Sequence, residues 1–274
     1  MAAQAARAPV EEAPLLLREA KGPIAVVTFN RPAQRNTLSA EVIAALHAAL
    51  DEIATDKTVR ALVIASQGPA FSSGHDLKQL MSHRGDPDGG RAYFAKTMNA
   101  CSAMMQAIVN LPKPVIAAVQ GIATAAGCQL VASCDMAVAS DDARFATSGI
   151  DNGLFCSTPM VALSRNVSRK QAMEMLMTGE PISAQRAVEI GLVNHVVPAG
   201  HERDAALALA QKVARKSAYA LKLGKQAFYR QVEMNLADAY RLTAEVMTEN
   251  MMAFDAIEGI GAFIEKREPK WQDK

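Results

Sequence analysis

The chain has 274 residues and half of them are hydrophobic, so it is long enough for one large domain with a sizeable core. Lys and Arg number 29 against 28 Asp and Glu, and the net charge of +1 excludes the broadly basic surface that nucleic-acid binding requires. No apolar run is long enough to cross a membrane, and the Ala-rich start lacks the apolar segment of a secretory signal. We interpret residues 1–13 as a disordered tail.

The first elements predicted along the chain are a hairpin and a helix. Residues 15–18 and 24–29 read as two strands joined by the turn Lys21-Gly22-Pro23. Ser39 is a candidate N-cap, and apolar residues at helical spacing continue to Ile53.

Short apolar strands then alternate with helices. We predict strands over 60–66, 113–121 and 134–140, and helices over 91–110 and 123–133, a pattern typical of a layered α/β core. From about residue 168 onward we expect helices only. The predicted organisation is therefore a core over 14–200 and a helical region over 201–274, whose methionines at helical spacing indicate core or oligomer contacts.

The cysteines predict no metal site. Cys101, Cys128, Cys134 and Cys156 form no CxxC pair and lack a His at ligand spacing, so we expect free, buried thiols. Free thiols suit a reducing compartment, either the cytoplasm or, in a eukaryote, the mitochondrion.

Two loops are candidates for the site. The loop "GPAFSSGHDLKQL" (68–80) follows a predicted strand, and so does "QGIATAAGCQL" (120–130). Both are rich in small residues and open a helix, so each presents free backbone N–H groups. Two such loops suggest a two-donor oxyanion hole, although Gly-rich helix starts also serve as packing devices.

Several sequence segments along the chain resemble the enoyl-CoA hydratase/isomerase family, or crotonase superfamily. They are "NRPAQRNTL", "FSSGHDL", "KPVIAAVQGIATAAGCQLVASCDMAVAS", "TGEPISAQRAVEIGLVNHVV" and "AFIEKR". "GLFCSTP" and "TGEPISAQ" are most similar to the branch of enoyl-CoA hydratase domain-containing proteins. The resemblance implies an α/β fold, namely a spiral of ββα units with a helical C-terminal trimerisation region, and an acyl-CoA thioester as ligand.

The resemblance also implies roles for individual residues. The thioester oxygen would accept hydrogen bonds from the backbone N–H groups of His75 and Ala126. The backbone at Ser73 and Leu77 would hold the CoA adenine, and the Arg35 guanidinium would lie near the phosphates. The His75 side chain has no implied role, and we read Asp76 as a loop or cap residue.

The resemblance further implies a homotrimer or hexamer, in which Phe263 and Lys266 would lie at the CoA of a neighbouring subunit. No tightly bound cofactor and no metal are implied. The CoA thioester would be the substrate or ligand.

Hydratases of this family use two glutamates, and their positions fall on Gln129 and Gly149 here. An amide orients water but does not exchange a proton usefully near neutral pH, and glycine has no side chain. We therefore expect Gln129 to line the acyl pocket as a neutral hydrogen-bonding group. Three possibilities stay open: a reassigned activity on acyl-CoA, an isomerase that uses Asp151, and an acyl-CoA-binding protein without turnover.

Overall fold

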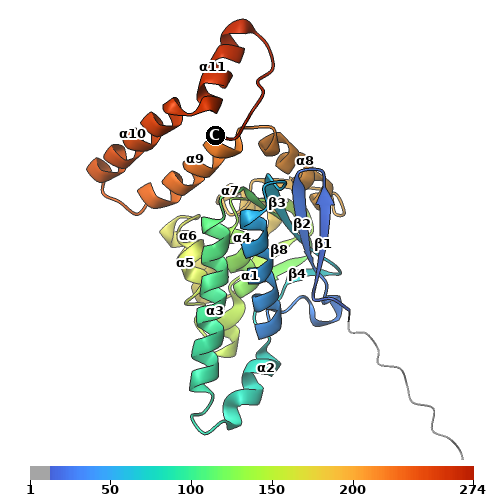
Figure 1. Ribbon diagram of the computed structural model, residues 1–274. Helices are drawn as coiled ribbons and strands as arrows, with labels where there is room; N and C mark the ends of the chain where they lie inside the picture. The colour runs from blue at the N-terminus through green and yellow to red at the C-terminus, as the bar shows by residue number, and fades with distance from the viewer. Residues whose placement is uncertain (1–12) are drawn as a thin grey trace, which may run out of the picture.

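A computed structural model describes residues 13–274 as an α/β fold with two sheets and a helical C-terminal region (Figure 1). The predicted tail over 1–13 lies, apart from Ala13, outside the described residues. The α/β class follows from the alternation of short apolar strands with helices, as the sequence predicts.

The larger sheet contains six strands in the order β1-β2-β3-β5-β7-β10. Its first two strands form the predicted antiparallel hairpin, and all the later neighbours pair in parallel. The strands are β1 (Leu16–Lys21), β2 (Ile24–Phe29), β3 (Ala61–Ser66), β5 (Val115–Val119), β7 (Met136–Ser140) and β10 (His195–Val197).

A second sheet of four strands has the order β4-β6-β8-β9. Its strands are β4 (Ala70–Ser72), β6 (Ile122–Thr124), β8 (Arg144–Ala146) and β9 (Ile182–Ser183). Three times in succession the chain places one strand in the large sheet and the next in the small one (β3 and β4, β5 and β6, β7 and β8) before it enters helices. This repetition is the predicted spiral of ββα units.

Helices cover both faces of the large sheet. Along β3, Leu62 and Ile64 point into a core shared with α1 and α3, whereas Val63 points into a second core against α8. Because both faces are buried, the parallel strands read as continuous apolar runs in the sequence. The helices before residue 200 are α1 (Ala40–Thr55), α2 (Leu77–Ser82), α3 (Arg91–Asn110), α4 (Ala126–Ser133), α5 (Pro159–Leu163), α6 (Arg169–Thr178) and α7 (Ala184–Glu189).

Two expectations for the elements are wrong. The helix expected to start at residue 123 starts at Ala126, because residues 122–124 form β6 and pair with β8. Strands also continue beyond residue 168, as β9 and β10. Both errors concern strands of two or three residues, which are too short for a period-2 pattern to distinguish them from a loop or a helix.

The helical C-terminal region consists of α8 (Glu202–Ala214), α9 (Ala218–Gln231), α10 (Leu236–Met252) and α11 (Phe254–Glu265). Figure 1 shows α8 against the core, whereas α9, α10 and α11 project from it; we call these three helices the arm. Among residues 13–274, no helix has both the length and the apolar character to cross a membrane. The arm nevertheless exposes large hydrophobic side chains: Phe228, Leu236, Tyr240, Met247, Met251, Met252, Ile257, Ile260, Phe263 and Ile264.

A largely buried ion pair attaches the arm to the core. The Nζ of Lys225 on α9 lies 2.7 Å from a carboxylate oxygen of Asp135, between α4 and β7. The hydroxyl of Tyr229 donates to the same carboxylate, and so does the Val115 N–H at the start of β5. Burial lowers the pKa of Lys225, and the Asp135 carboxylate opposes that shift. The pairing with Asp135 thus offsets part of the cost of burying the ammonium group.

We predict that Lys225→Met lowers the free energy of unfolding by about 3 kcal/mol, because it leaves a buried carboxylate without its counter-ion. The matched control is Arg241→Met, which breaks an exposed pair with Asp238 and should cost less than about 1 kcal/mol. Denaturant titration of both variants measures the difference. Equal losses would contradict an anchoring role for Lys225.

Candidate functional site

The first loop is fixed by a buried asparagine. The Asn36 side chain is fully enclosed and accepts a hydrogen bond from the Arg31 N–H at 2.9 Å. Its amide donates to the carbonyl of Gln67 at 2.9 Å and to that of Ala70 at 2.8 Å. One side chain thereby connects the turn around residues 31–36 to the start of β4, the strand that leads into the first loop.

The peptide between Gly74 and His75 has a fixed orientation. The Gly74 carbonyl accepts a hydrogen bond from the Leu38 N–H at 2.8 Å. In a trans peptide the carbonyl and the N–H point in opposite directions, so the His75 N–H points away from Leu38. Gly74 has φ of +83°, which glycine adopts without steric cost.

The peptide between Ala125 and Ala126 is fixed in the same way. The Ala125 carbonyl accepts from the Gln129 N–H at 3.0 Å, as the first hydrogen bond of α4. The Ala126 N–H therefore points out of the N-terminal end of the helix, where the dipole favours negative charge. Ala125 has φ of 50° and ψ of −119°, a conformation that is strained for a residue with a Cβ.

The two loops are in backbone contact. A Cβ placed on Gly74 would lie 3.2 Å from the nitrogen of Ala126. A Cβ on Gly127 would lie only 2.3 Å from the carbonyl oxygen of Ser72. Glycine at these two positions thus allows the approach that brings the His75 and Ala126 peptides together.

Neither of the two N–H groups has an acceptor among residues 13–274. A backbone N–H in a half-buried or buried position normally finds a partner in the protein or in water. The structure therefore brings together two unpaired donors, of His75 and Ala126, from two loops that touch each other.

Gln129 lies in the first turn of α4, three residues after Ala126. It is 5% exposed, and its Oε1 has no hydrogen-bond partner among the described residues. A helical side chain leans toward the preceding turn, so Gln129 leans over Ala126, three residues before it. That Gln129 lines an acyl pocket as a neutral hydrogen-bonding group stays a prediction.

Gly149 is closed off by its own neighbours. It lies in the short 3₁₀ segment Ser148–Asn152, and a Cβ there would be 2.6 Å from the Leu154 carbonyl oxygen and 2.7 Å from the Sγ of Cys156. The loop after the 3₁₀ segment fills the space that a longer side chain at position 149 would need.

Burial favours the neutral form of the His75 side chain and of the cysteine thiols. The imidazole of His75 is buried, and this burial lowers its pKa, a shift that the backbone of Leu38 partly opposes. All four cysteines are free and buried, as predicted, and burial raises the pKa of Cys101 and Cys128 to about 12. Burial also raises the pKa of Cys156, so none of these thiols is a ready nucleophile at neutral pH.

The residues expected around CoA fall into two groups. Arg35, Ser73 and Leu77 lie on or beside the first loop; Arg35 and Leu77 are exposed, and the Ser73 N–H donates to the Arg35 carbonyl at 3.0 Å. Phe263 and Lys266 lie on or just after α11, and Figure 1 shows α11 at the opposite end of the molecule from α2. One chain alone does not bring the two groups together.

Asp151 is exposed, and its carboxylate oxygens lie beside Gly179, within 3.3 Å of where a Cβ on that glycine would be. It is a first-turn residue of the 3₁₀ segment and packs toward the end of α6. Asp76, in contrast, is the N-cap of α2, as predicted, and its Oδ1 accepts from the Gln79 N–H.

A groove of about 600 Å³ lies elsewhere, between α1 and α3. Its walls carry Ala44, His47, Tyr93 and Lys96, and none of the predicted site residues lines it.

Comparison with known proteins identifies the family to which this chain belongs. The sequence model described as Enoyl-CoA hydratase/isomerase matches residues 19–274. The chain therefore belongs to the enoyl-CoA hydratase/isomerase family, and the resemblance noted in the sequence is confirmed.

Individual relatives resemble the chain over nearly its whole length. Enoyl-CoA hydratase domain-containing protein 3, mitochondrial, of Homo sapiens is 46% identical over 269 residues, which cover 98% of this chain and 87% of that protein. The crystal structure of an enoyl-CoA hydratase from Mycobacterium smegmatis is 50% identical with a TM-score of 0.89, and the match covers 94% of this chain and 99% of that one. The crystal structure of the human domain-containing protein 3 also has a TM-score of 0.89, with 94% and 100% coverage. These matches confirm the predicted fold.

Sequence reasoning missed two structural supports of the site. Asn36 belongs to the segment "NRPAQRN", yet no role was predicted for it. An Asn in a turn is a signal for side-chain hydrogen bonds to the backbone. Gly127 was read only as part of a small-residue run, because its contact with Ser72 joins segments more than fifty residues apart.

We predict that Ala125→Gly raises the free energy of unfolding by up to about 2 kcal/mol, because glycine relieves the strain at φ 50°. Ala132→Gly, within the same helix, should lower it by about 1 kcal/mol or more. Denaturant titration compares the two. A loss in both variants would argue against strain at Ala125.

We also predict that Gly149→Ala lowers the free energy of unfolding by about 1–3 kcal/mol, since the new methyl group meets the Leu154 carbonyl and Cys156. Gly224→Ala in α9 serves as control, because a Cβ there meets nothing within 4 Å; it should be neutral or stabilising by about 1 kcal/mol. Thermal or chemical unfolding of both variants tests the difference in sign.

Proposed function

We propose that this chain binds an acyl-CoA thioester and polarises its carbonyl with the backbone N–H groups of His75 and Ala126. The observation that carries the proposal is the pair of unpaired donors on two touching loops, each held from its carbonyl side. Such donors are fixed before the ligand arrives, so they stabilise an oxyanion without reorganisation, by about 3–4 kcal/mol each in a reaction that develops the charge.

The CoA portion would lie along the first loop. Arg35 is exposed, and its guanidinium has no hydrogen-bond partner among residues 13–274, so it is available for a phosphate. The carbonyl of Ser73 and the backbone at Leu77, whose side chain is 44% exposed, would receive the adenine. Phe263, which is 84% exposed, and Lys266 would contribute from a neighbouring copy.

We further propose that the chain assembles as a homotrimer or hexamer through the exposed hydrophobic side chains of the arm. A patch of this kind on a folded chain is typical of an interface. The distance between α11 and the first loop supports the same assembly, because Phe263 and Lys266 reach a CoA site only if that site belongs to another copy.

We expect ordinary hydration of an enoyl-CoA to be slow in this chain. Gln129 and Gly149 are the counterparts of the hydratase glutamates in our proposal, and the loop at Leu154 and Cys156 occupies the space beside Gly149. An acid or base typically contributes about 10²–10⁴-fold, so the loss of both leaves hydration slow. Asp151 is exposed and directed toward Gly179, which gives the isomerase possibility little support. We therefore favour thioester binding and polarisation without hydration.

The names of the vertebrate relatives contain the word mitochondrial. For a eukaryotic source this supports the mitochondrial rather than the cytoplasmic location.

The decisive test measures how much the thioester carbonyl contributes to the affinity for the ligand. Calorimetry with butyryl-CoA should give binding about tenfold tighter than with S-butyl-CoA, a thioether without the carbonyl, because two hydrogen bonds are lost. Equal affinities would show that the two N–H groups do not receive the carbonyl. No binding of either compound would overturn the acyl-CoA assignment as a whole.

A second prediction concerns activity. Gln129→Glu should not restore strong hydration of crotonyl-CoA, because no acid or base is present at Gly149. Mass spectrometry after incubation with a panel of enoyl- and acyl-CoA thioesters detects any product. Substantial hydration by this single variant would contradict our reasoning, and turnover that is lost in Asp151→Asn would favour the isomerase instead.

A further inference from the structure

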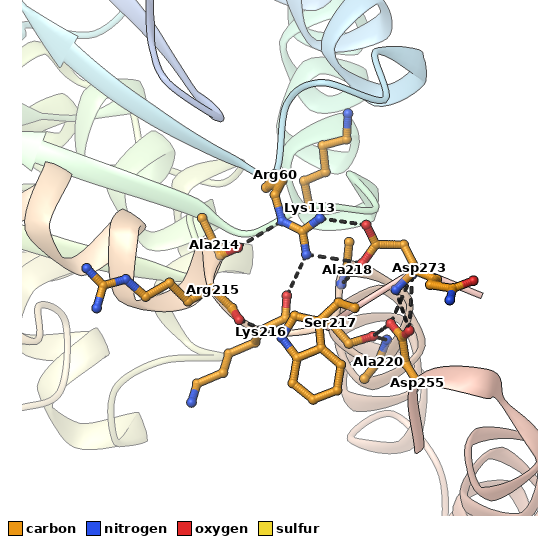
Figure 2. A network of polar contacts seen from close by, with 12 residues as sticks. Arg60, Lys113, Ala214, Arg215, Lys216, Ser217, Ala218, Ala220, Asp255 and Asp273 are labelled. Atoms are coloured by element: carbon orange, nitrogen blue, oxygen red, sulfur yellow. Dashed lines mark hydrogen bonds and ion pairs between the residues drawn. The ribbon is translucent and has the colours of Figure 1, made fainter. Parts of the chain in front are cut away.

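Residues 270–274, which we call the strap, fold back onto the base of the arm (Figure 2). Their main contact is Asp255, which lies at the start of α11 and is only 3% exposed. The Asp255 carboxylate accepts from the Ser217 hydroxyl at 2.5 Å, from the Gln272 N–H at 2.7 Å and from the Asp273 N–H at 3.0 Å. Ser217 is itself the N-cap of α9, so one buried carboxylate joins the starts of two helices to the strap.

The strap also reaches the core. Arg60, which directly precedes β3, donates to the carbonyls of Ala214 at 2.8 Å and Lys216 at 2.7 Å, and to the Asp273 carboxylate at 2.5 Å. Asp273 in turn accepts from the Ala218 N–H at 2.8 Å. Figure 2 shows these groups around the junction between α8 and α9. The large sheet, this junction and the strap are therefore linked by charge-assisted hydrogen bonds.

The third contact of the strap is an aromatic ring against α11. The indole Nε1 of Trp271 donates to the Arg215 carbonyl at 2.7 Å. Its ring packs on Gly259 of α11, where a Cβ would be 3.0 Å from the nearest ring atom. Gly261 lies two residues further along the same helix, and a Cβ placed on it would meet nothing within 4 Å.

These contacts lie next to the junction between α10 and α11. Helices α10 and α11 meet at Ala253, a single residue in extended conformation, and α11 is the last helix of the arm. We propose that the strap sets the orientation of α11 relative to the core, with Asp255 and Trp271 as its positioning residues. On the proposed function, this orientation presents Phe263 and Lys266 to the second copy.

The test uses Trp271 as its own reporter, because it is the only tryptophan in the chain. Gly259→Gln should displace the indole and raise its acrylamide quenching constant about twofold or more, and Asp255→Asn should act in the same direction. Gly261→Gln is the matched control, with the same side chain on the same helix, and should leave the quenching unchanged. Hydrogen exchange over residues 254–265 should quicken about tenfold in the first two variants only.

Equal quenching and equal exchange in all three variants would overturn the proposal. If Asp255→Asn does not fold, the pair Gly259→Gln and Gly261→Gln decides the question, together with removal of residues 271–274 followed by hydrogen exchange. These measurements contain no acyl-CoA, so their outcome is independent of whether the proposed function holds. Light scattering then measures self-association. If the orientation of α11 presents Phe263 and Lys266 to a second copy, displacement of the strap should weaken self-association.

Discussion

The close approach of two backbone segments is the constraint on which the candidate site depends. Gly74 lies against the nitrogen of Ala126, and Gly127 lies against the carbonyl of Ser72. A methyl group at Gly127 would lie 2.3 Å from the Ser72 carbonyl oxygen, so the loops would have to move apart, and the two unpaired N–H groups would move with them. The hydrogen bonds from Leu38 and Gln129 hold the carbonyls of the same two peptides, so the donors are fixed by the fold and not by a ligand. The strain at Ala125 is the local cost of that arrangement.

Substitutions affect the backbone donors of this site and its side chains differently. Every residue except proline carries a backbone N–H group, so the pair of donors does not depend on which other side chain stands at position 75 or 126. Acid–base chemistry depends wholly on side chains, and here position 129 carries an amide and position 149 has no room for a side chain. The loop at Leu154 and Cys156 closes onto Gly149, so a larger residue at position 149 would require that loop to move as well.

Polar contacts attach the arm to the rest of the chain, whereas apolar contacts hold the core together. Lys225 and Asp135 pair under partial burial, and Asp255 gathers donors from α9 and from the strap. Directional contacts of this kind contribute modestly to stability, yet they specify one geometry, since a misplaced partner leaves a buried charge unpaired. They suit a projecting element whose apolar faces are exposed in the single chain.

The sequence by itself determined the α/β class, the hairpin, the N-cap at Ser39, the helix over 91–110 and the family, because each of these rests on local periodicity or on contiguous words. It also singled out both loops and the neutral residue at position 129. Only the tertiary structure decided that β6, β9 and β10 are strands, since two or three residues acquire that identity from their partners across the sheet. The contact between Gly127 and Ser72, the closure of Gly149 and the strap on Asp255 likewise join segments distant in the chain. Such contacts have no local signature, because the atoms that define them become neighbours only when the spiral has closed.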